Sequence, residues 1–149
     1  MIASTVAWRS AARGGLVAAI LVTTGALARA DETIVVALMD QGMESMHMEL
    51  RTDRVKAGNV TFNVTNKSQD LVHEFIVFKS DIPIGALPYK EEEKEVNEEA
   101  IEAHNEIEDI DPGKSGTLTV KLEPGSYILL CNKPGHFKAG MVHTLTVTP

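Results

Sequence analysis

The sequence predicts an all-β fold, an antiparallel β-sandwich of six or seven short strands. The first observation behind this is a series of short runs that are either apolar throughout or alternate between apolar and polar residues, as strands do. The second is a set of three Pro-Gly pairs, at 112–113, 124–125 and 134–135, which mark turns between these runs. Short strands at such spacing are typical of a two-layer sandwich.

Each expected strand follows from its own pattern. Alternation predicts half-buried strands, whereas the continuous apolar run at 75–78 predicts a strand covered on both faces inside a layered structure. The polar stretch at 66–70 ends one strand before the next begins. The expected strands span residues 33–38, 60–65, 75–78, 117–122, 127–130 and 142–148.

One segment breaks the β pattern. Eleven acidic residues lie between positions 91 and 111, and Val96, Ala100, Ala103 and Ile107 recur within it at helical spacing. We therefore expect a short acidic helix inserted into the sandwich. Because its like charges repel one another, this helix would depend on packing against the strands.

Residues 1–30 have the pattern of a signal peptide. Arginines precede an apolar run at 16–27, and the small-x-small motif at 28–30 predicts cleavage before Asp31. The apolar run is shorter than the roughly 20 residues that a membrane-spanning helix needs. We expect residues 31–149 to form one domain that is exported to the periplasm and not inserted in a membrane.

The net charge of this domain limits the classes of partner that it can bind. Removing residues 1–30 leaves 11 Lys and Arg against 21 Asp and Glu, a formal charge of −10. Nucleic acid is excluded as a partner, since phosphate binding requires a cationic surface. We expect a monomer that docks on a partner protein with a basic surface.

The chemistry is concentrated in residues 131–141, where Cys131, His136 and Met141 follow one another with four residues between each pair. The Pro-Gly turn at 134–135 and Gly140 let this loop fold its three side chains toward one ion. His73, at the start of the strand that includes 75–78, would supply one more nitrogen. Two imidazoles, a thiolate and a weak axial thioether are the ligand set of blue copper sites.

With these residues in place, the sequence resembles the cupredoxin family, which includes plastocyanins, azurins and sulfocyanins. Residues 54–62 resemble an early strand pair of that family, and residues 122–127 resemble the turn and tyrosine before its ligand cysteine. The resemblance implies a Greek-key sandwich and one type 1 copper ion bound by His73, Cys131, His136 and Met141.

The same residues allow other interpretations of the site. A zinc ion could use the cysteine and histidines, but zinc has little use for a thioether. Taken singly, His73 and Met141 could be core residues, and Cys131 a small buried hydrophobe. His104 and His143 belong to no ligand pattern and are left out of the site.

The copper set predicts an electron carrier rather than an enzyme, because one metal with no open position offers no place for a substrate. His136, on the loop, should lie nearest solvent. The alternative is a copper-tolerance or copper-delivery protein with a second, Cu(I) site of soft ligands near the N-terminus. Its candidate ligands are Met39, Met43, Met46, His47 and Met48, although Met46 and Met48 share one strand face and could equally be core residues. A cysteine-nucleophile enzyme using Cys131 and His136 is a third hypothesis.

Overall fold

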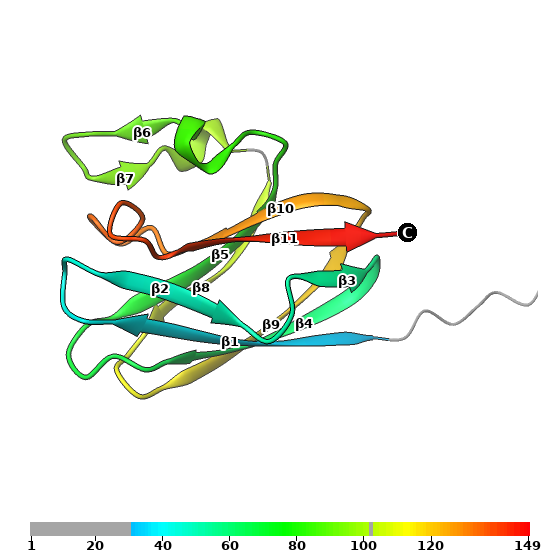
Figure 1. Ribbon diagram of the computed structural model, residues 1–149, viewed down its shortest axis with the longest axis horizontal. Coiled ribbons are helices and arrows are strands. Elements are labelled where there is room, and N and C mark those ends of the chain that lie inside the picture. Colours follow the sequence, from blue (N-terminus) through cyan, green and yellow to red (C-terminus); the bar gives the residue numbers. More distant parts are fainter. Residues whose placement is uncertain (1–30, 102) are drawn as a thin grey trace, which may run out of the picture.

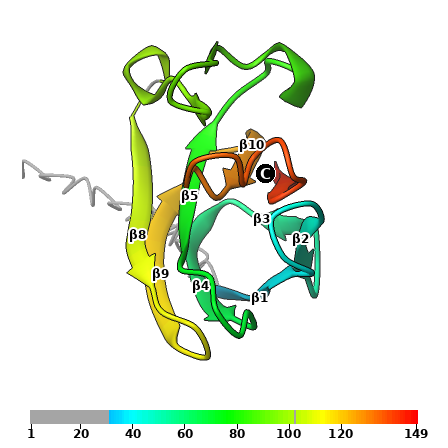
Figure 2. The ribbon, with the colours of Figure 1, turned by 90° about the vertical axis from the view of Figure 1, so that its left-hand side faces the viewer.

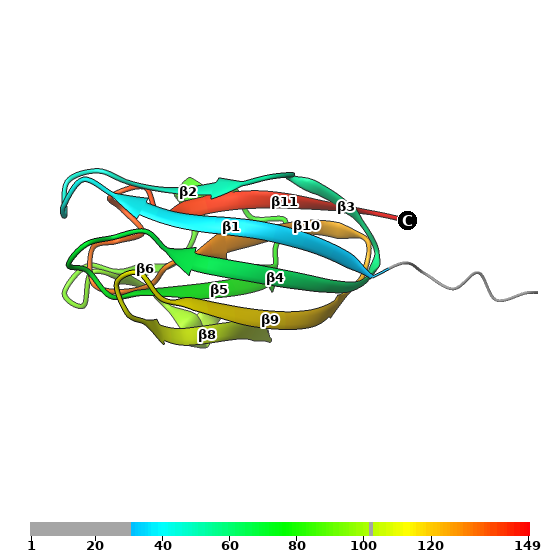
Figure 3. The ribbon, with the colours of Figure 1, turned by 90° about the horizontal axis from the view of Figure 1, so that it is seen from below.

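The computed structural model describes residues 31–101 and 103–149, which form two facing β-sheets and a small hairpin (Figure 1). The predicted signal peptide, residues 1–30, lies outside the described residues. The four-stranded sheet has the order β2-β1-β4-β9, seen face-on in Figure 3. Its strands are β1 (Glu32–Asp40), β2 (Met46–Leu50), β4 (Gly58–Asn66) and β9 (Ser115–Leu122).

The five-stranded sheet has the order β3-β11-β10-β5-β8. Its strands are β3 (Arg54–Lys56), β5 (His73–Lys79), β8 (His104–Ile110), β10 (Gly125–Leu130) and β11 (Val142–Thr148). The hairpin pairs β6 (Tyr89–Lys90) with β7 (Glu95–Val96), and two 3-10 turns, η1 (Ile84–Ala86) and η2 (Glu98–Ala100), flank it. The predicted sandwich is confirmed, but two strand pairs, β1 with β4 and β3 with β11, are parallel rather than antiparallel.

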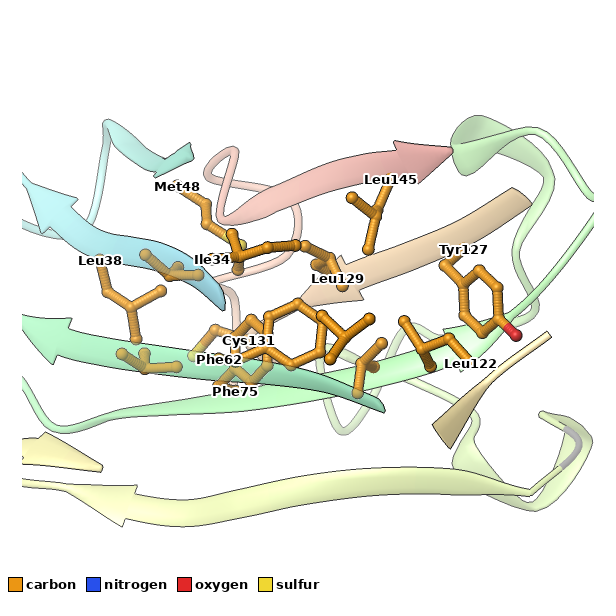
Figure 4. Close-up of a cluster of buried hydrophobic side chains, with 14 of the residues drawn as sticks. Ile34, Leu38, Met48, Phe62, Phe75, Leu122, Tyr127, Leu129, Cys131 and Leu145 are labelled. Carbon is orange, nitrogen blue, oxygen red and sulfur yellow. The ribbon is translucent and has the colours of Figure 1, made fainter. Parts of the chain in front are cut away.

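The main core lies between the two sheets and follows from the alternation in the strands. In β4 the buried side chains are Val60, Phe62 and Val64, while the residues between them face outward. Phe62 packs on Phe75 of the opposite sheet with ring centroids 5.1 Å apart. Figure 4 shows both rings within this cluster, together with Cys131, so the thiol belongs to the interior of the sandwich.

A second, smaller core covers the outer face of the five-stranded sheet. Ile76 and Phe78 point outward from β5 and are buried under Leu87 and Val96, which precede β8 in the chain. Figures 1 and 2 show this segment folded over the side of the sheet that faces away from the other sheet. Strand β5 is therefore covered on both faces, as its continuous apolar sequence predicted.

The predicted acidic helix is wrong. Val96 lies in β7 and is buried in the outer core, whereas Ile107 lies in β8 and pairs with Phe75 of β5. Ala100 and Ala103 are exposed, so they do not form a buried stripe with Val96. Val96 and Ile107 thus belong to two different strands. Their tertiary contacts outweigh the helical propensity of the segment, which repulsion between its like charges already reduces. Among the described residues, no helix is long and apolar enough to cross a membrane.

The loop between β10 and β11 lies between the β1–β2 hairpin and the β6–β7 hairpin (Figure 1). On one side, the Met46 N–H donates to the Ala139 carbonyl at 2.9 Å, and on the other the Gly135 N–H donates to the Lys94 carbonyl at 2.8 Å. Gly140 has φ +110°, and a Cβ there would lie 2.5 Å from the Met46 carbonyl oxygen. Only glycine allows the loop to approach β2 this closely.

Replacing Gly140 with alanine should therefore destabilise the protein by about 2 kcal/mol or more, through both the strained φ and the clash with backbone. The matched control is Gly85→Ala, since a Cβ at Gly85 meets nothing within 4 Å. Chemical denaturation of both metal-free variants measures the difference. Equal losses in the two variants would contradict the proposed close packing of the loop.

Candidate metal centre

Two neighbouring strands bring the first candidate ligands together. Strand β5 begins at His73 and runs antiparallel to β10, which ends one residue before Cys131. The two residues therefore meet at the same end of the sheet. The pairing of β5 with β8 shifts register between His73 and Phe75, an irregularity of the kind that re-aims side chains beside functional sites.

The three candidate donors of His73, Cys131 and His136 converge and form a group that could hold a metal ion. The two Nδ1 atoms are 3.1 Å apart, and Cys131 Sγ lies 3.8 Å from His73 Nδ1 and 3.3 Å from His136 Nδ1. A triangle with these sides has a centre about 2 Å from every corner, which is close to the length of a metal–nitrogen bond and about 0.3 Å shorter than a metal–sulfur bond. The three donors are therefore spaced to hold one ion after a small adjustment at the sulfur.

Met141 is joined to the same group through its backbone. Its N–H donates to the His136 carbonyl, and its carbonyl accepts from the Cys131 N–H, both at 3.0 Å. The side chain is fully buried in the main core. All four residues predicted from the sequence therefore lie at one end of the sandwich. Of the four, only His136 has any exposed surface, 5%, so the ligand expected nearest solvent is itself largely buried.

Burial keeps the site neutral before a metal binds. It raises the pKa of the Cys131 thiol to about 12. Burial, followed by the nearby His73, lowers the pKa of His136 to about 4, and burial also lowers the pKa of His73. At neutral pH the three groups are a thiol and two uncharged imidazoles. A soft sulfur with two imidazoles, beside a thioether, suits copper.

Glu74 joins the start of β5 to the residues that follow β10. Its backbone N–H donates to Cys131 Sγ at 3.3 Å, and its side chain accepts from the Asn132 N–H at 2.5 Å. Burial raises the pKa of this carboxyl, while Lys133, 3.6 Å away, opposes the rise. Glu74 was not predicted from the sequence, although its place between His73 and a run of buried strand residues is a visible signal.

Asn132 also forms hydrogen bonds with the acidic segment. Its side-chain oxygen accepts from the Val96 N–H at 2.7 Å, and its amide donates to the Val96 carbonyl at 2.9 Å and to Glu98 at 2.7 Å. The residue next to Cys131 is thus bonded to β7 and η2. The acidic segment braces the ligand loop in addition to carrying charge.

Asp40 was also missed. Its carboxylate lies 3.2 Å from His73 Nε2, on the edge of the ring opposite the converging donors. Burial opposes the shift, but hydrogen bonds from Ser68, His73 and Gly42 outweigh it and lower the pKa of Asp40. Since 33 residues separate Asp40 from His73, only the pairing of β1 within the sandwich reveals this contact.

The predicted second copper site near the N-terminus is not supported. Met46 and Met48 are core residues, each 4% exposed, whereas His47 between them faces outward and Met43 is 51% exposed in the turn before β2. These side chains therefore point in different directions. The strand periodicity of 2 separates residues that look clustered in the sequence.

The remaining histidines lie apart from this centre. His104 Nε2 is 3.9 Å from a Glu98 oxygen and 4.0 Å from a Glu106 oxygen, which makes a second group of side chains that could hold a metal ion. His143 lies in β11 with Nδ1 2.8 Å from the Thr144 carbonyl. Neither belongs to the centre formed by His73, Cys131 and His136.

Known proteins resemble this chain in part of its sequence and in its fold. A stretch of 41 residues, 27% of the chain, is 49% identical to auracyanin-B from Chloroflexus aurantiacus and covers 17% of that protein's length. The reduced auracyanin of Roseiflexus castenholzii has a similar structure, with a TM-score of 0.55 and 23% identity over 78% of this chain and 97% of that one. Rusticyanin from Thiobacillus ferrooxidans gives a TM-score of 0.60 and 19% identity over 79% and 77%.

The two structural matches show a shared fold. The family assignment comes from the sequence, because residues 35–148 match the model of the copper-binding proteins of the plastocyanin/azurin family. That span includes both sheets and every residue of the candidate centre. The chain therefore belongs to the plastocyanin/azurin family of copper-binding proteins.

Proposed function

We propose that this protein is a type 1 copper electron carrier. One copper ion would be bound by His73, Cys131 and His136, with the Met141 thioether as a weaker fourth ligand. The observation that carries the proposal is the triangle of donor atoms on three buried side chains, whose centre lies about 2 Å from each of them. Bound copper supplies one-electron redox chemistry.

The protein's own residues keep the site unchanged while the charge on the metal changes. The Glu74 N–H stabilises negative charge on Cys131 Sγ, and two hairpins hold the ligand loop from opposite sides. His136, with the only exposed edge in the ligand set, is the natural exit for the electron. Burial of the other ligands excludes water and favours the lower charge of Cu(I).

The proposal includes export. The arginines, the apolar run at 16–27 and the small residues at 28 and 30 support a signal peptide cleaved before Asp31.

Cu(II) added to the metal-free protein should produce an intense visible band from thiolate-to-copper charge transfer, at one equivalent. Cys131→Ser should abolish the band and keep the fold by circular dichroism, because serine is close in size. His47→Asn, an exposed histidine outside the centre, is the control and should keep the band. A colourless wild-type protein at saturating Cu(II) would contradict the proposal.

Copper binding at neutral pH should release about one proton per ion. With a pKa of about 12, the Cys131 thiol is protonated before binding and must become a thiolate. His136, with a pKa of about 4, has no proton to lose. Calorimetric titration in buffers of different ionisation enthalpy counts the protons, and Cys131→Ser should reduce the count to near zero. A wild-type count near zero or two would show that the protonation states are wrong.

We further propose that the redox partner docks beside the acidic segment with a basic surface. The domain expected after cleavage has a formal charge of −10, and much of it lies on the segment bonded to the ligand loop. Three of these acids are already compensated, since Glu91 pairs with Lys138, Glu93 with Lys90 and Asp109 with Lys133. Exposed Glu92 and Glu99 are better placed to steer a cationic partner.

Small redox complexes test this proposal without the natural partner. Oxidation of the Cu(I) protein by a cationic cobalt phenanthroline complex should slow as salt rises, whereas oxidation by anionic ferricyanide should accelerate. Glu92→Gln with Glu99→Gln should slow the cobalt reaction at low salt. The control replaces Asp53 with Asn and Glu123 with Gln, at the other end of the sandwich. Equal stopped-flow rates for the two double variants would contradict steering by the acidic segment.

A further inference from the structure

The contact between Asp40 and His73 is more than a surface ion pair. The His73 side chain is 0% exposed and the Asp40 side chain 9% exposed, and the carboxylate lies 3.2 Å from Nε2. A second oxygen of Asp40 accepts from the Gly42 N–H at 3.1 Å, which fixes the carboxylate at the end of β1. A buried charge held by several donors is built into the fold.

This contact determines which nitrogen of His73 carries the proton. A carboxylate accepts and cannot donate, so Nε2 must be the protonated nitrogen in the neutral ring. The lone pair of Nδ1 is then directed into the triangle formed with Cys131 and His136. The hydrogen bond also fixes the orientation of the ring, because rotation would remove the partner of the buried N–H.

We propose that Asp40 is a positioning residue that keeps His73 in its metal-binding tautomer and lowers the reduction potential of the copper centre. This inference rests on the proposed copper function. A negative charge on the far side of a ligand ring stabilises Cu(II) more than Cu(I), since Cu(II) carries one more positive charge. Asp40 therefore opposes the preference for Cu(I) that the weak axial Met141 and the dry surroundings produce.

The test compares Asp40→Asn with Asp70→Asn. Asparagine keeps the shape of aspartate and removes the charge, and Asp70 is an exposed carboxylate three residues before His73. Asp40→Asn should shift the ratio of Cu(I) to Cu(II) affinity about tenfold toward Cu(I), which is a rise of about 59 mV in a one-electron potential. Redox titration measures it. A shift no larger than that of Asp70→Asn would overturn the proposal.

A measurement on the metal-free protein separates this inference from the copper proposal. Nitrogen-15 NMR should show His73 protonated at Nε2 and unprotonated at Nδ1, with an Nε2 proton that exchanges slowly with solvent. Asp40→Ala should make that exchange much faster, and Asp70→Ala should leave it unchanged. Protonation at Nδ1 in the wild type would overturn the role of Asp40. A wild-type protein with no thiolate-to-copper band would instead overturn the proposed function, while the tautomer of His73 would still test Asp40.

Discussion

The candidate centre depends on the junction between the start of β5 and the end of β10. Two hydrogen bonds form it: the Glu74 N–H donates to Cys131 Sγ, and the Asn132 N–H donates to the Glu74 carboxylate. They fix the strand that carries His73 against the residue that follows β10. Because the junction is buried, leaving either donor unpaired would cost about 1–3 kcal/mol, so the strand ends have little freedom to separate.

The rest of the loop is braced from both sides. The first residue of β2, Met46, contacts it at Ala139, and the β6–β7 hairpin contacts it at Gly135 and Asn132. Three donor atoms are thereby gathered around one point before any ion binds. Such preorganisation is what an electron carrier requires, since a ligand set that does not move adds little to the barrier for electron transfer. The carboxyl groups of Asp40 and Glu74 lie beside this geometry, one against His73 Nε2 and the other against the Asn132 N–H.

The convergence of His73, Cys131 and His136 could be predicted from the sequence, because these residues lie in one loop or at the end of a strongly patterned strand. That they bind a metal together with Met141 stays a prediction. Cys131, His136 and Met141 occupy one loop, and His73 opens a strand whose apolar run was evident. The predicted helical insert was wrong because Val96 packs in the outer core, whereas Ile107 pairs with Phe75 of β5. Periodicity alone does not show that two apolar residues pack against different elements. The contact of Asp40 with His73 could not be predicted from the sequence either. It depends on the parallel pairing of β1 with β4, which joins segments that are distant in the chain.

X-ray absorption at the copper edge tests the central claim most directly, because it reports the atoms bound to the ion in both redox states. The account predicts one sulfur and two nitrogens, with the nitrogens at about 2 Å and the sulfur slightly farther, and nearly the same shell for Cu(II) and Cu(I). A shell of nitrogen and oxygen alone, or the loss of a ligand on reduction, would contradict it.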